Sequence, residues 1–428
     1  MGRNSGLPHA ALYRETGAPY AMQGSRMSVA GGKPEAGVAP ALAVPAYVMR
    51  KLPQDTMTAQ QRIEATLRGE LPDRVPIFDL IQNIELMELI TGEKLTPANG
   101  LELLCRTIGE RLDITRGIAP PAEEKIVRHD DGFVYKQEWW TTWLIGRPFH
   151  DVAGLLDYIR RDIEGLYDRK RGDMWTFAGK GNVWGRADES PREQFLKLQE
   201  KVGENTVLFP NESPVGLDTA HIRAGLELFV YAYAENPELV SDWLEALNWA
   251  EIQRVHETAD AELSPVTLVY ADLADKNQPM FSPAFLRREF FPRLRKLVDA
   301  WHSHGIKVIY HSDGNLWPLL EDYKAVGVEG INPLEPLSHM YAGDVRKAHP
   351  DWILMGGIDV SQLLCFGSEE EVRRAVRTTM TEAGAGGRLW LGSSTEIHPA
   401  ANVANVLAMW DEIETNGRYD RAGSLKQM

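Results

Sequence analysis

Short apolar runs alternate with long amphipathic stretches along most of this chain, and no other feature constrains its fold as strongly. Residues 307–310, 352–355 and 388–391 are apolar apart from a leading basic residue in two of the three. Such runs are typical of strands buried on both faces, which occur in parallel sheets covered by helices. The alternation therefore predicts an α/β fold built on a parallel sheet.

The number of these runs predicts a closed barrel. The expected strands are residues 75–79, 206–209, 267–270, 307–310, 330–332, 352–355 and 388–391, and a hairpin inserted at 126–140 brings the candidates to eight. This set favours a single-domain (β/α)8 barrel. An open, doubly wound sheet is the alternative, but no GxGxxG or Walker A run stands at a strand–helix turn.

Capping residues mark the helices between the strands. Ser368 and Glu371 have the spacing of a capping box at the start of one predicted helix. Another predicted helix runs up to Gly305 and is expected to bend at Pro292, because proline breaks the hydrogen-bond ladder.

Polar side chains follow the carboxyl ends of the predicted strands, which is where a barrel carries its active site. They are Asp79, Asn211, Asp272, Asp275, His311, Asp313, Glu335, Asp359 and Glu396. Loop polarity alone does not require so many carboxylates and imidazoles at equivalent positions. The sequence therefore predicts an enzyme with its site at this end of the barrel.

His311-Ser312-Asp313 is the sharpest of these motifs. Alternate residues of a strand point to the same side, so His311 and Asp313 are expected to converge on one ligand or metal. Glu396, or His398 beside it, would complete a mixed nitrogen and oxygen site suited to zinc or another divalent ion. In the alternative interpretation no metal is bound, and Asp313 orients His311 or caps the following turn.

The remaining polar candidates carry two interpretations each. Asp272 is a candidate general acid or base. The predicted catalytic residues are Asp272, His311, Asp313 and Glu396. Asp275, Glu335 and Asp359 either anchor a polar substrate or cap loops and helices. The predicted substrate-binding residues are Asp79, Asn211, Asp275, Glu335, Asp359, Trp140 and Trp143.

The tryptophans of this set belong to a cluster inside the hairpin insertion. Trp139, Trp140 and Trp143 lie close together in sequence. Aromatic faces of this kind stack on flat ligands or hold cationic ones. Packing beneath the insertion is the alternative for at least two of them.

Composition and charge exclude several classes of protein. The formal net charge is −15, which disfavours nucleic acid and anionic membranes as partners. The two cysteines, Cys105 and Cys365, lie far apart, so no disulfide framework is expected and a cytoplasmic location fits. The longest early apolar stretch, residues 38–48, is broken by prolines and is too short to span a bilayer.

Three segments are expected along the chain. Residues 1–55 are rich in glycine, alanine and proline and are expected to form a disordered extension. The barrel is expected over residues 56–420. Residues 421–428 are expected to be a short tail.

Ordered motifs over residues 57–419 identify a family. The chain resembles the uroporphyrinogen decarboxylase superfamily, and its methyltransferase-like branch more than the true decarboxylases. The motifs are Pro72-Asp73-Arg74-Val75-Pro76, Phe281-Ser282-Pro283, His311-Ser312-Asp313-Gly314, Asn332-Pro333-Leu334-Glu335-Pro336 and Met355-Gly356-Gly357-Ile358-Asp359.

The resemblance implies a (β/α)8 barrel with one of two activities. True decarboxylases act without a cofactor on a tetrapyrrole, which they hold with basic residues. The methyltransferase branch moves methyl groups to or from a cobalamin carried on a partner protein, and its thiol-methylating members hold zinc through His-x-Cys and a later Cys. Family members are often dimers, so a homodimer is expected as one arrangement.

This sequence departs from both patterns. The first strand region lacks the basic run that holds tetrapyrrole carboxylates, and Asp79 matches the decarboxylase aspartate only loosely. The His-x-Cys position contains His311 and Asp313, and the later Cys position falls near Thr395 or Glu396. Both thiolates are therefore replaced by oxygen groups, which favours a harder metal, or none, and a substrate other than a thiol.

Three functions follow as hypotheses. The first is corrinoid-linked methyl transfer from a small methoxy or methylamine compound, or between a corrinoid protein and tetrahydrofolate. The second is a carboxy-lyase reaction on a tetrapyrrole, for which Arg62, Arg74, Arg147 and Arg186 are the candidate cations. The third is a non-catalytic protein that binds a corrinoid or tetrapyrrole.

Overall fold

The computed structural model describes residues 55–116, 118, 123–139, 141–168, 190–204, 206–209, 212–420 and 425 of the chain. The chain divides into two compact units, Met1–Lys51 and Leu52–Met428, and every described residue belongs to the second. The expected N-terminal extension and C-terminal tail thus lie outside the described residues, except for Asp55 and Leu425.

Eight parallel strands form the barrel. The first is a short segment around Ile77 and Phe78, and the third is split into two pieces. The second strand is β1 (Ile114–Thr115), and the two pieces of the third are β5 (Val207–Leu208) and β6 (Ser213–Pro214). The remaining five strands are β7 (Val266–Tyr270), β8 (Lys307–His311), β9 (Gly330–Leu334), β10 (Ile353–Gly356) and β11 (Leu389–Trp390).

The pairings between these strands close the barrel. Strands β6 to β11 form one parallel sheet in sequence order. Ile77 bridges Leu391 beside β11, Phe78 bridges Ile114 in β1, and β1 pairs with β5, all in parallel. Because β5 and β6 are successive pieces of the third strand, the ring of strands returns to its start. The predicted (β/α)8 barrel is confirmed.

Alternate strand residues separate an inner core from an outer one. Leu268 of β7 and Ile309 of β8 belong to the apolar cluster that fills the barrel. Val269 and Tyr310 belong to the larger cluster between the strands and the helices. Because the side-chain period of a strand is two residues, the side chain of His311 shares the inner side with Ile309.

Fifteen α-helices are described in the second unit. They are α1 (Ala59–Arg68), α2 (Ile84–Thr91), α3 (Gly100–Arg111), α4 (Val152–Tyr167), α5 (Pro191–Val202), α6 (Gly216–Ala224), α7 (Leu226–Glu235), α8 (Pro237–Thr258), α9 (Pro283–Glu289), α10 (Phe291–Ser303), α11 (Leu320–Val326), α12 (Ala342–Ala348), α13 (Leu363–Phe366), α14 (Glu369–Ala383) and α15 (Val403–Asn416).

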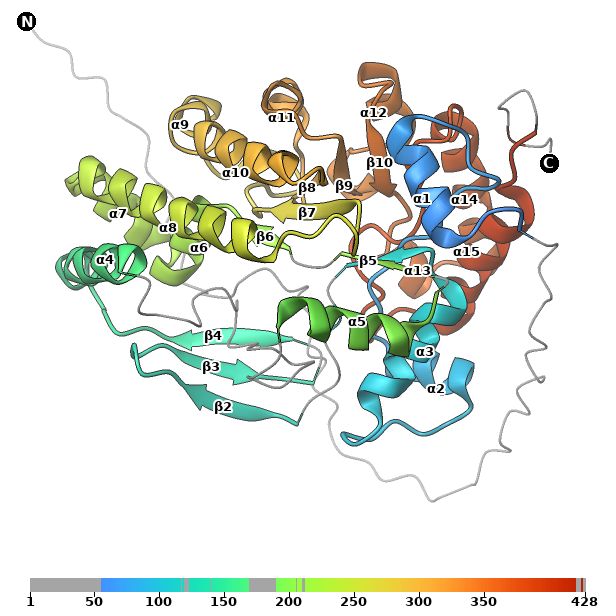
Figure 1. Ribbon diagram of the computed structural model, residues 1–428, viewed down its shortest axis with the longest axis horizontal. Coiled ribbons are helices and arrows are strands. Elements are labelled where there is room, and N and C mark those ends of the chain that lie inside the picture. Colours follow the sequence, from blue (N-terminus) through green and yellow to red (C-terminus); the bar gives the residue numbers. More distant parts are fainter. Residues whose placement is uncertain are drawn as a thin grey trace, which may run out of the picture. The chain divides into compact units, whose positions relative to one another are not determined.

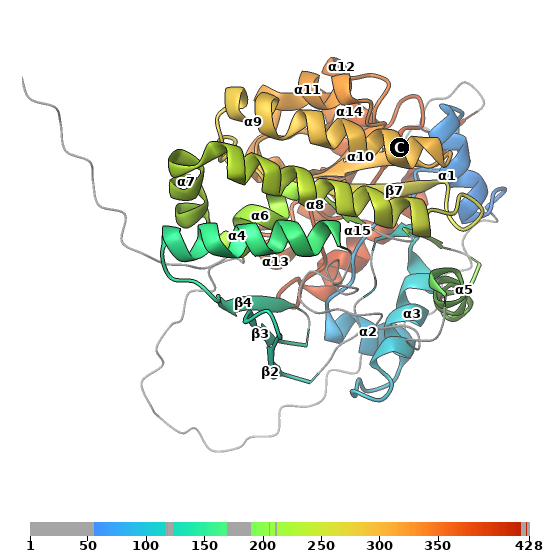
Figure 2. The same cartoon turned by 60° about the vertical axis from the view of Figure 1, so that its left-hand side comes forward.

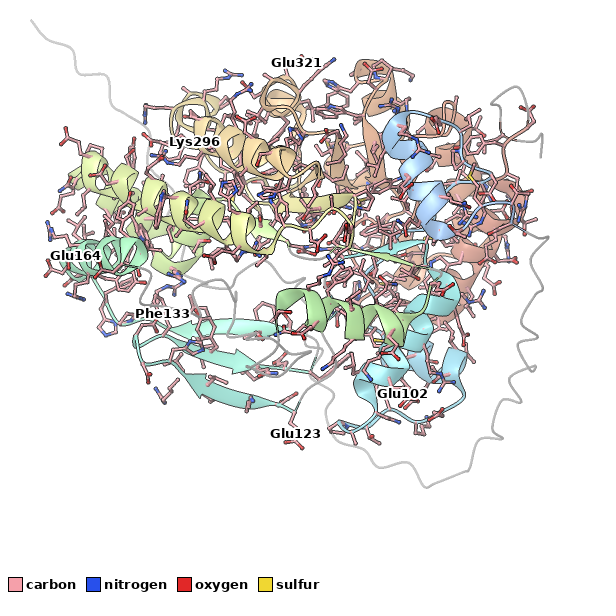
Figure 3. All side chains as sticks on the ribbon, in the orientation of Figure 1. Glu102, Glu123, Phe133, Glu164, Lys296 and Glu321 are labelled. Carbon is pink, nitrogen blue, oxygen red and sulfur yellow. The ribbon has the colours of Figure 1, made fainter. Side chains whose placement is uncertain are left out.

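The longer helices cover the outside of the strands. Helices α10, α11 and α12 lie along strands β7 to β10 (Figure 1), and α4, α8 and α10 lie side by side across the outer face (Figure 2). Lys296 on α10 and Glu321 on α11 point away from the strands (Figure 3) and are largely exposed. The apolar faces of these helices are thus left for the outer core.

The helix boundaries follow the local signals in the sequence. Ser368 and Glu371 form a capping box at the start of α14. The helix breaks between α9 and α10 at Phe290, two residues before Pro292, which confirms the expected bend. None of the helices in the described ranges is long and apolar enough to cross a membrane.

The identity of the second barrel strand corrects a prediction. The hairpin exists, but β2 (Lys125–Arg128), β3 (Val134–Gln137) and β4 (Thr142–Gly146) form a separate antiparallel sheet outside the barrel. The strand that completes the set of eight is instead β1, the second barrel strand in chain order. It is only two residues long, which is too short for its apolar pattern to stand out from the end of α3.

Candidate functional site

His311 lies at the mouth of the barrel as the last residue of β8. Its side chain is buried, and Nδ1 lies 2.6 Å from Oδ1 of Asn332, in the neighbouring strand β9. An amide oxygen only accepts hydrogen bonds, so Nδ1 carries the ring hydrogen. In the neutral imidazole, Nε2 therefore presents its lone pair to the mouth.

Two carboxylates lie close to this imidazole. Asp272 Oδ1, from the loop after β7, lies 3.7 Å from His311 Nε2 and accepts a hydrogen bond of 3.3 Å from the backbone N–H of Asp313. Asp272, His311 and Asp313 each place one ligand atom within 4.8 Å of the others. The structure thus confirms that His311 and Asp313 converge, and it places Asp272 in the group.

The chemistry of this group fits a divalent cation. Oδ1 of Asp313 is buried and has no hydrogen-bond partner among the described residues, so it is available to a metal. Two carboxylates and an imidazole suit zinc and harder divalent ions better than a thiolate-preferring metal. The hydrogen bond from His311 to Asn332 is the outer contact that a metal-binding histidine usually makes.

Burial favours the uncharged forms of Asp313 and His311. Burial raises the pKa of Asp313 well above its ordinary value, and the charges of Asp272 and Glu335 raise it further. Burial, assisted by the positive charge of Arg116, lowers the pKa of His311 to about 4. At neutral pH the imidazole is therefore uncharged and keeps its lone pair.

Arg116 is a site residue that the sequence did not reveal. It follows β1, and its Nε and Nη2 donate hydrogen bonds of 2.8 and 2.7 Å to the two carboxylate oxygens of Glu212. Its Nη1 lies 3.2 Å from Nδ1 and 3.3 Å from Nε2 of His311. A polar residue after a strand would have identified Arg116, but the strand itself is too short to be seen.

Glu335 and Glu396 lie around this centre with different roles. Oε2 of Glu335 accepts hydrogen bonds from the backbone N–H of Gly314 and the hydroxyl of Ser338, so it shapes the loop that follows His311. Glu396 is half-buried after β11, and its negative charge raises the pKa of Asp313. The ligand group at His311 contains Asp272, and the predicted place of Glu396 as a ligand stays a prediction.

Three other predicted substrate-binding carboxylates bond to neighbouring groups. Asp275 accepts from two backbone N–H groups of its own turn. Asp359 accepts from three backbone N–H groups at the start of α13. Asp79 is fully buried and accepts from the Ser393 hydroxyl at 2.5 Å and from the Trp410 indole on α15. Their roles in substrate binding stay predictions.

Some candidates lie outside the described residues. These are Asn211, Trp140 and Arg186. Trp143 is half-buried on β4, opposite Lys136 of β3. Arg147 donates hydrogen bonds to two backbone carbonyl oxygens near the end of α6, which leaves it in a structural role.

Arg62 and Arg74 lie at the wrong end of the barrel to hold a substrate. Both donate hydrogen bonds to the carboxylate of Asp113, which precedes β1, and Arg62 also donates to Asp73 at 2.7 Å. These contacts are at the amino ends of the strands, where conserved polar groups serve stability. The two arginines are therefore not the carboxylate-binding cations that a decarboxylase would need there.

A family model agrees with this barrel. The model described as uroporphyrinogen decarboxylase (URO-D) matches residues 199–415, half of the 428-residue chain. The chain belongs to the uroporphyrinogen decarboxylase family. The matched span of this URO-D family member contains Glu212, Asp272, His311 and Asp313. No curated protein sequence matches it.

Solved structures share the barrel at low sequence identity. A methyltransferase from Methanosarcina mazei aligns at a TM-score of 0.59 and 18% identity, covering 84% of this chain and 98% of that one. A B12-independent methionine synthase from Shewanella sp. W3-18-1 aligns at a TM-score of 0.33 and 11% identity, covering 79% and 97%. The first likeness supports the fold, and the second is too low to carry an argument.

Proposed function

We propose that this URO-D family protein is a methyltransferase, which moves a methyl group from a small methylated compound to a corrinoid on a partner protein. Asp272, His311 and Asp313 would hold a divalent metal, with zinc as the first candidate. The observation that carries the proposal is that Asp272, His311 and Asp313 each place one ligand atom within 4.8 Å of the others.

The reaction requires help for the leaving group. As the methyl group goes to the corrinoid, the oxygen or nitrogen that carried it keeps the bonding electrons and needs a proton or a Lewis acid. A divalent ion at His311 would supply the Lewis acid. Glu396, half-buried on the loop after β11, is the group proposed to hold the proton.

The oxygen-rich group also favours a class of substrate. Two carboxylates and one imidazole bind a metal suited to oxygen and nitrogen donors, whereas a thiol is activated by a thiolate-bound zinc. A methoxy or methylamine donor therefore fits better than a thiol. The Methanosarcina mazei protein of similar fold is itself called a methyltransferase, which agrees with this class of reaction.

Metal content and a corrinoid spectrum test the proposal. Plasma mass spectrometry of the purified full chain is expected to find about one divalent metal per chain, lost in the His311→Ala, Asp313→Ala variant. His256→Ala, at an exposed position on α8, is the control and keeps the metal. Addition of methoxy or methylamine donors to the protein with cob(I)alamin should change the corrinoid spectrum. Absence of both metal and any spectral change would refute the proposal.

A further inference from the structure

The guanidinium of Arg116 lies against the imidazole ring of His311. Its Nη1 is 3.2 Å from Nδ1 and 3.3 Å from Nε2, so it lies beside the ring and off the direction of the Nε2 lone pair. A metal ion bound at Nε2 would have the positive charge of Arg116 close to it. Because like charges repel, Arg116 opposes the binding of a metal ion to this group.

Glu212 fixes the guanidinium in this position. Both carboxylate oxygens of Glu212 accept hydrogen bonds from Arg116, and the side chains are only 15% and 17% exposed. A two-point contact of this kind sets the plane of the guanidinium as well as its distance. The negative charge of Glu212 also offsets most of the positive charge of Arg116 at the mouth of the barrel.

Carboxylates dominate the rest of the surroundings. Asp272 and Glu396 both raise the pKa of Arg116 through their negative charges, and Asp272 also lies beside His311. The exposed Asp272 and the less exposed Asp313 lie close together, so ionisation of both leaves two like charges that a cation stabilises. Arg116 is placed to balance this charge when no metal is present.

We propose that Arg116 is the resident cation of the Asp272–His311–Asp313 group and sets its affinity for divalent metal, with Glu212 acting in the opposite direction. The inference rests on the proposed metal site. Removal of Arg116 takes a like charge away from the metal, so binding tightens. Removal of Glu212 leaves the charge of Arg116 unbalanced, so binding weakens.

These opposite effects are tested by titrating the metal-free full chain with Zn²⁺ and Co²⁺ and measuring the metal affinity by calorimetry. Arg116→Gln is expected to bind roughly tenfold more tightly than the wild type, and Glu212→Gln roughly tenfold more weakly, since contacts around ligands change affinity by about 10–100-fold. Arg287→Gln, which removes an arginine paired with Asp322 on the outer helices, is the matched control and keeps the wild-type affinity.

Thermal unfolding supplies a second measurement that does not depend on activity. The rise in Tm caused by Zn²⁺ should be larger in Arg116→Gln than in the wild type, because the metal-free variant lacks the balancing cation. If Arg116→Gln does not fold, the double variant Arg116→Gln, Glu212→Gln removes the pair without changing the net charge. It is expected to bind metal more tightly than Glu212→Gln.

The outcomes separate this inference from the proposed function. If the wild type binds metal and Arg116→Gln binds it equally or more weakly, the role of Arg116 is wrong and the metal site stands. If Arg116→Gln binds metal and the wild type does not, Arg116 holds the site closed and the inference is supported. If neither binds metal, both the metal site and the role of Arg116 are refuted.

Discussion

At the scale of single residues, the amide of Asn332 decides what His311 can do. The hydrogen bond of 2.6 Å from Nδ1 to Asn332 Oδ1 fixes one tautomer of a buried ring. Without it, the ring can turn or place its hydrogen on Nε2, which removes the lone pair from the mouth. The chemistry at His311 therefore depends on a neighbour that itself touches no ligand.

Asn332→Ala is expected to weaken metal binding by roughly 10–100-fold without unfolding the barrel. The reason is the loss of the acceptor that orients His311. Calorimetric titration with Zn²⁺ measures the effect. Asn315→Ala, in the loop after β8, is the control, because among the described residues its side chain accepts a hydrogen bond from the backbone N–H of Trp317 and contacts none of the three ligand residues. An unchanged affinity in Asn332→Ala would show that the tautomer is fixed by other contacts.

Asp79 gives a pH dependence of stability that a single substitution should remove. Burial raises the pKa of this carboxyl to about 7 from the value near 3.8 of an exposed group, although Ser393 and Trp410 donate hydrogen bonds to it. Because the pKa of Asp79 is higher in the folded protein than in the unfolded chain, protonation of Asp79 stabilises the fold. This stabilisation is complete below pH ~4 and is lost as the pH rises to ~7, at up to about 1.4 kcal/mol per pH unit.

The matching experiment is chemical unfolding of Asp79→Asn and the wild type between pH 4 and 8. The wild type should lose stability relative to the variant across this range, because only the wild type must ionise a buried group. Asp157→Asn, at an exposed position on α4, removes the same charge and should follow the wild type. Parallel curves for Asp79→Asn and the wild type would contradict the raised pKa.

The sequence identified the centre of the site and missed its surroundings. His311, Asp313 and Asp272 were predictable because each directly follows an apolar strand. Arg116 was not, because β1 is two residues long, and the contact from Arg116 to His311 joins segments far apart in sequence. Asp79 follows a strand as well, yet its carboxylate turns outward to Trp410 on α15, which no local pattern reveals.

At the scale of elements, short polar signals place the helices that hold the strands. The hydroxyl of Ser368 accepts from the backbone N–H of Glu371, whose carboxylate accepts in return, so α14 begins at a defined residue. Helix α14 packs against α15 and α12. These boundaries were predictable because capping depends on residues only three positions apart, whereas the pairing of β1 with β5 depends on the closed barrel.

Ser368→Ala is expected to lower the free energy of unfolding by about 1 kcal/mol, since the first turn of α14 loses its side-chain acceptor. Urea denaturation measures the change. Ser303→Ala is the control, because that exposed hydroxyl only donates to a carbonyl of its own helix, and its effect should stay within about 0.5 kcal/mol. Equal effects of the two substitutions would show that the cap contributes nothing specific.

At the scale of the whole molecule, the two ends of the barrel have separate tasks. The amino ends carry a buried network in which Arg62 and Arg74 share the carboxylate of Asp113. The carboxyl ends carry Arg116 and His311. The charged groups at the amino ends connect the first helix to the first strands. Those at the carboxyl ends surround His311.

Asp113→Ala tests this division. It is expected to cost roughly 3–5 kcal/mol of stability, because two buried arginines lose their shared partner. Zn²⁺ affinity of the folded fraction should stay at the wild-type value, since the site lies at the other end. Denaturant unfolding and calorimetric titration measure the two quantities, and a loss of affinity in the folded protein would contradict the separation.

The split third strand has a consequence for the order in which the site is made. The break between β5 and β6 places Glu212 at the mouth, where it holds Arg116. Both residues precede Asp272, His311 and Asn332 in the chain. During synthesis on the ribosome, Arg116 and Glu212 therefore emerge before the imidazole and the carboxylates that they face in the finished barrel.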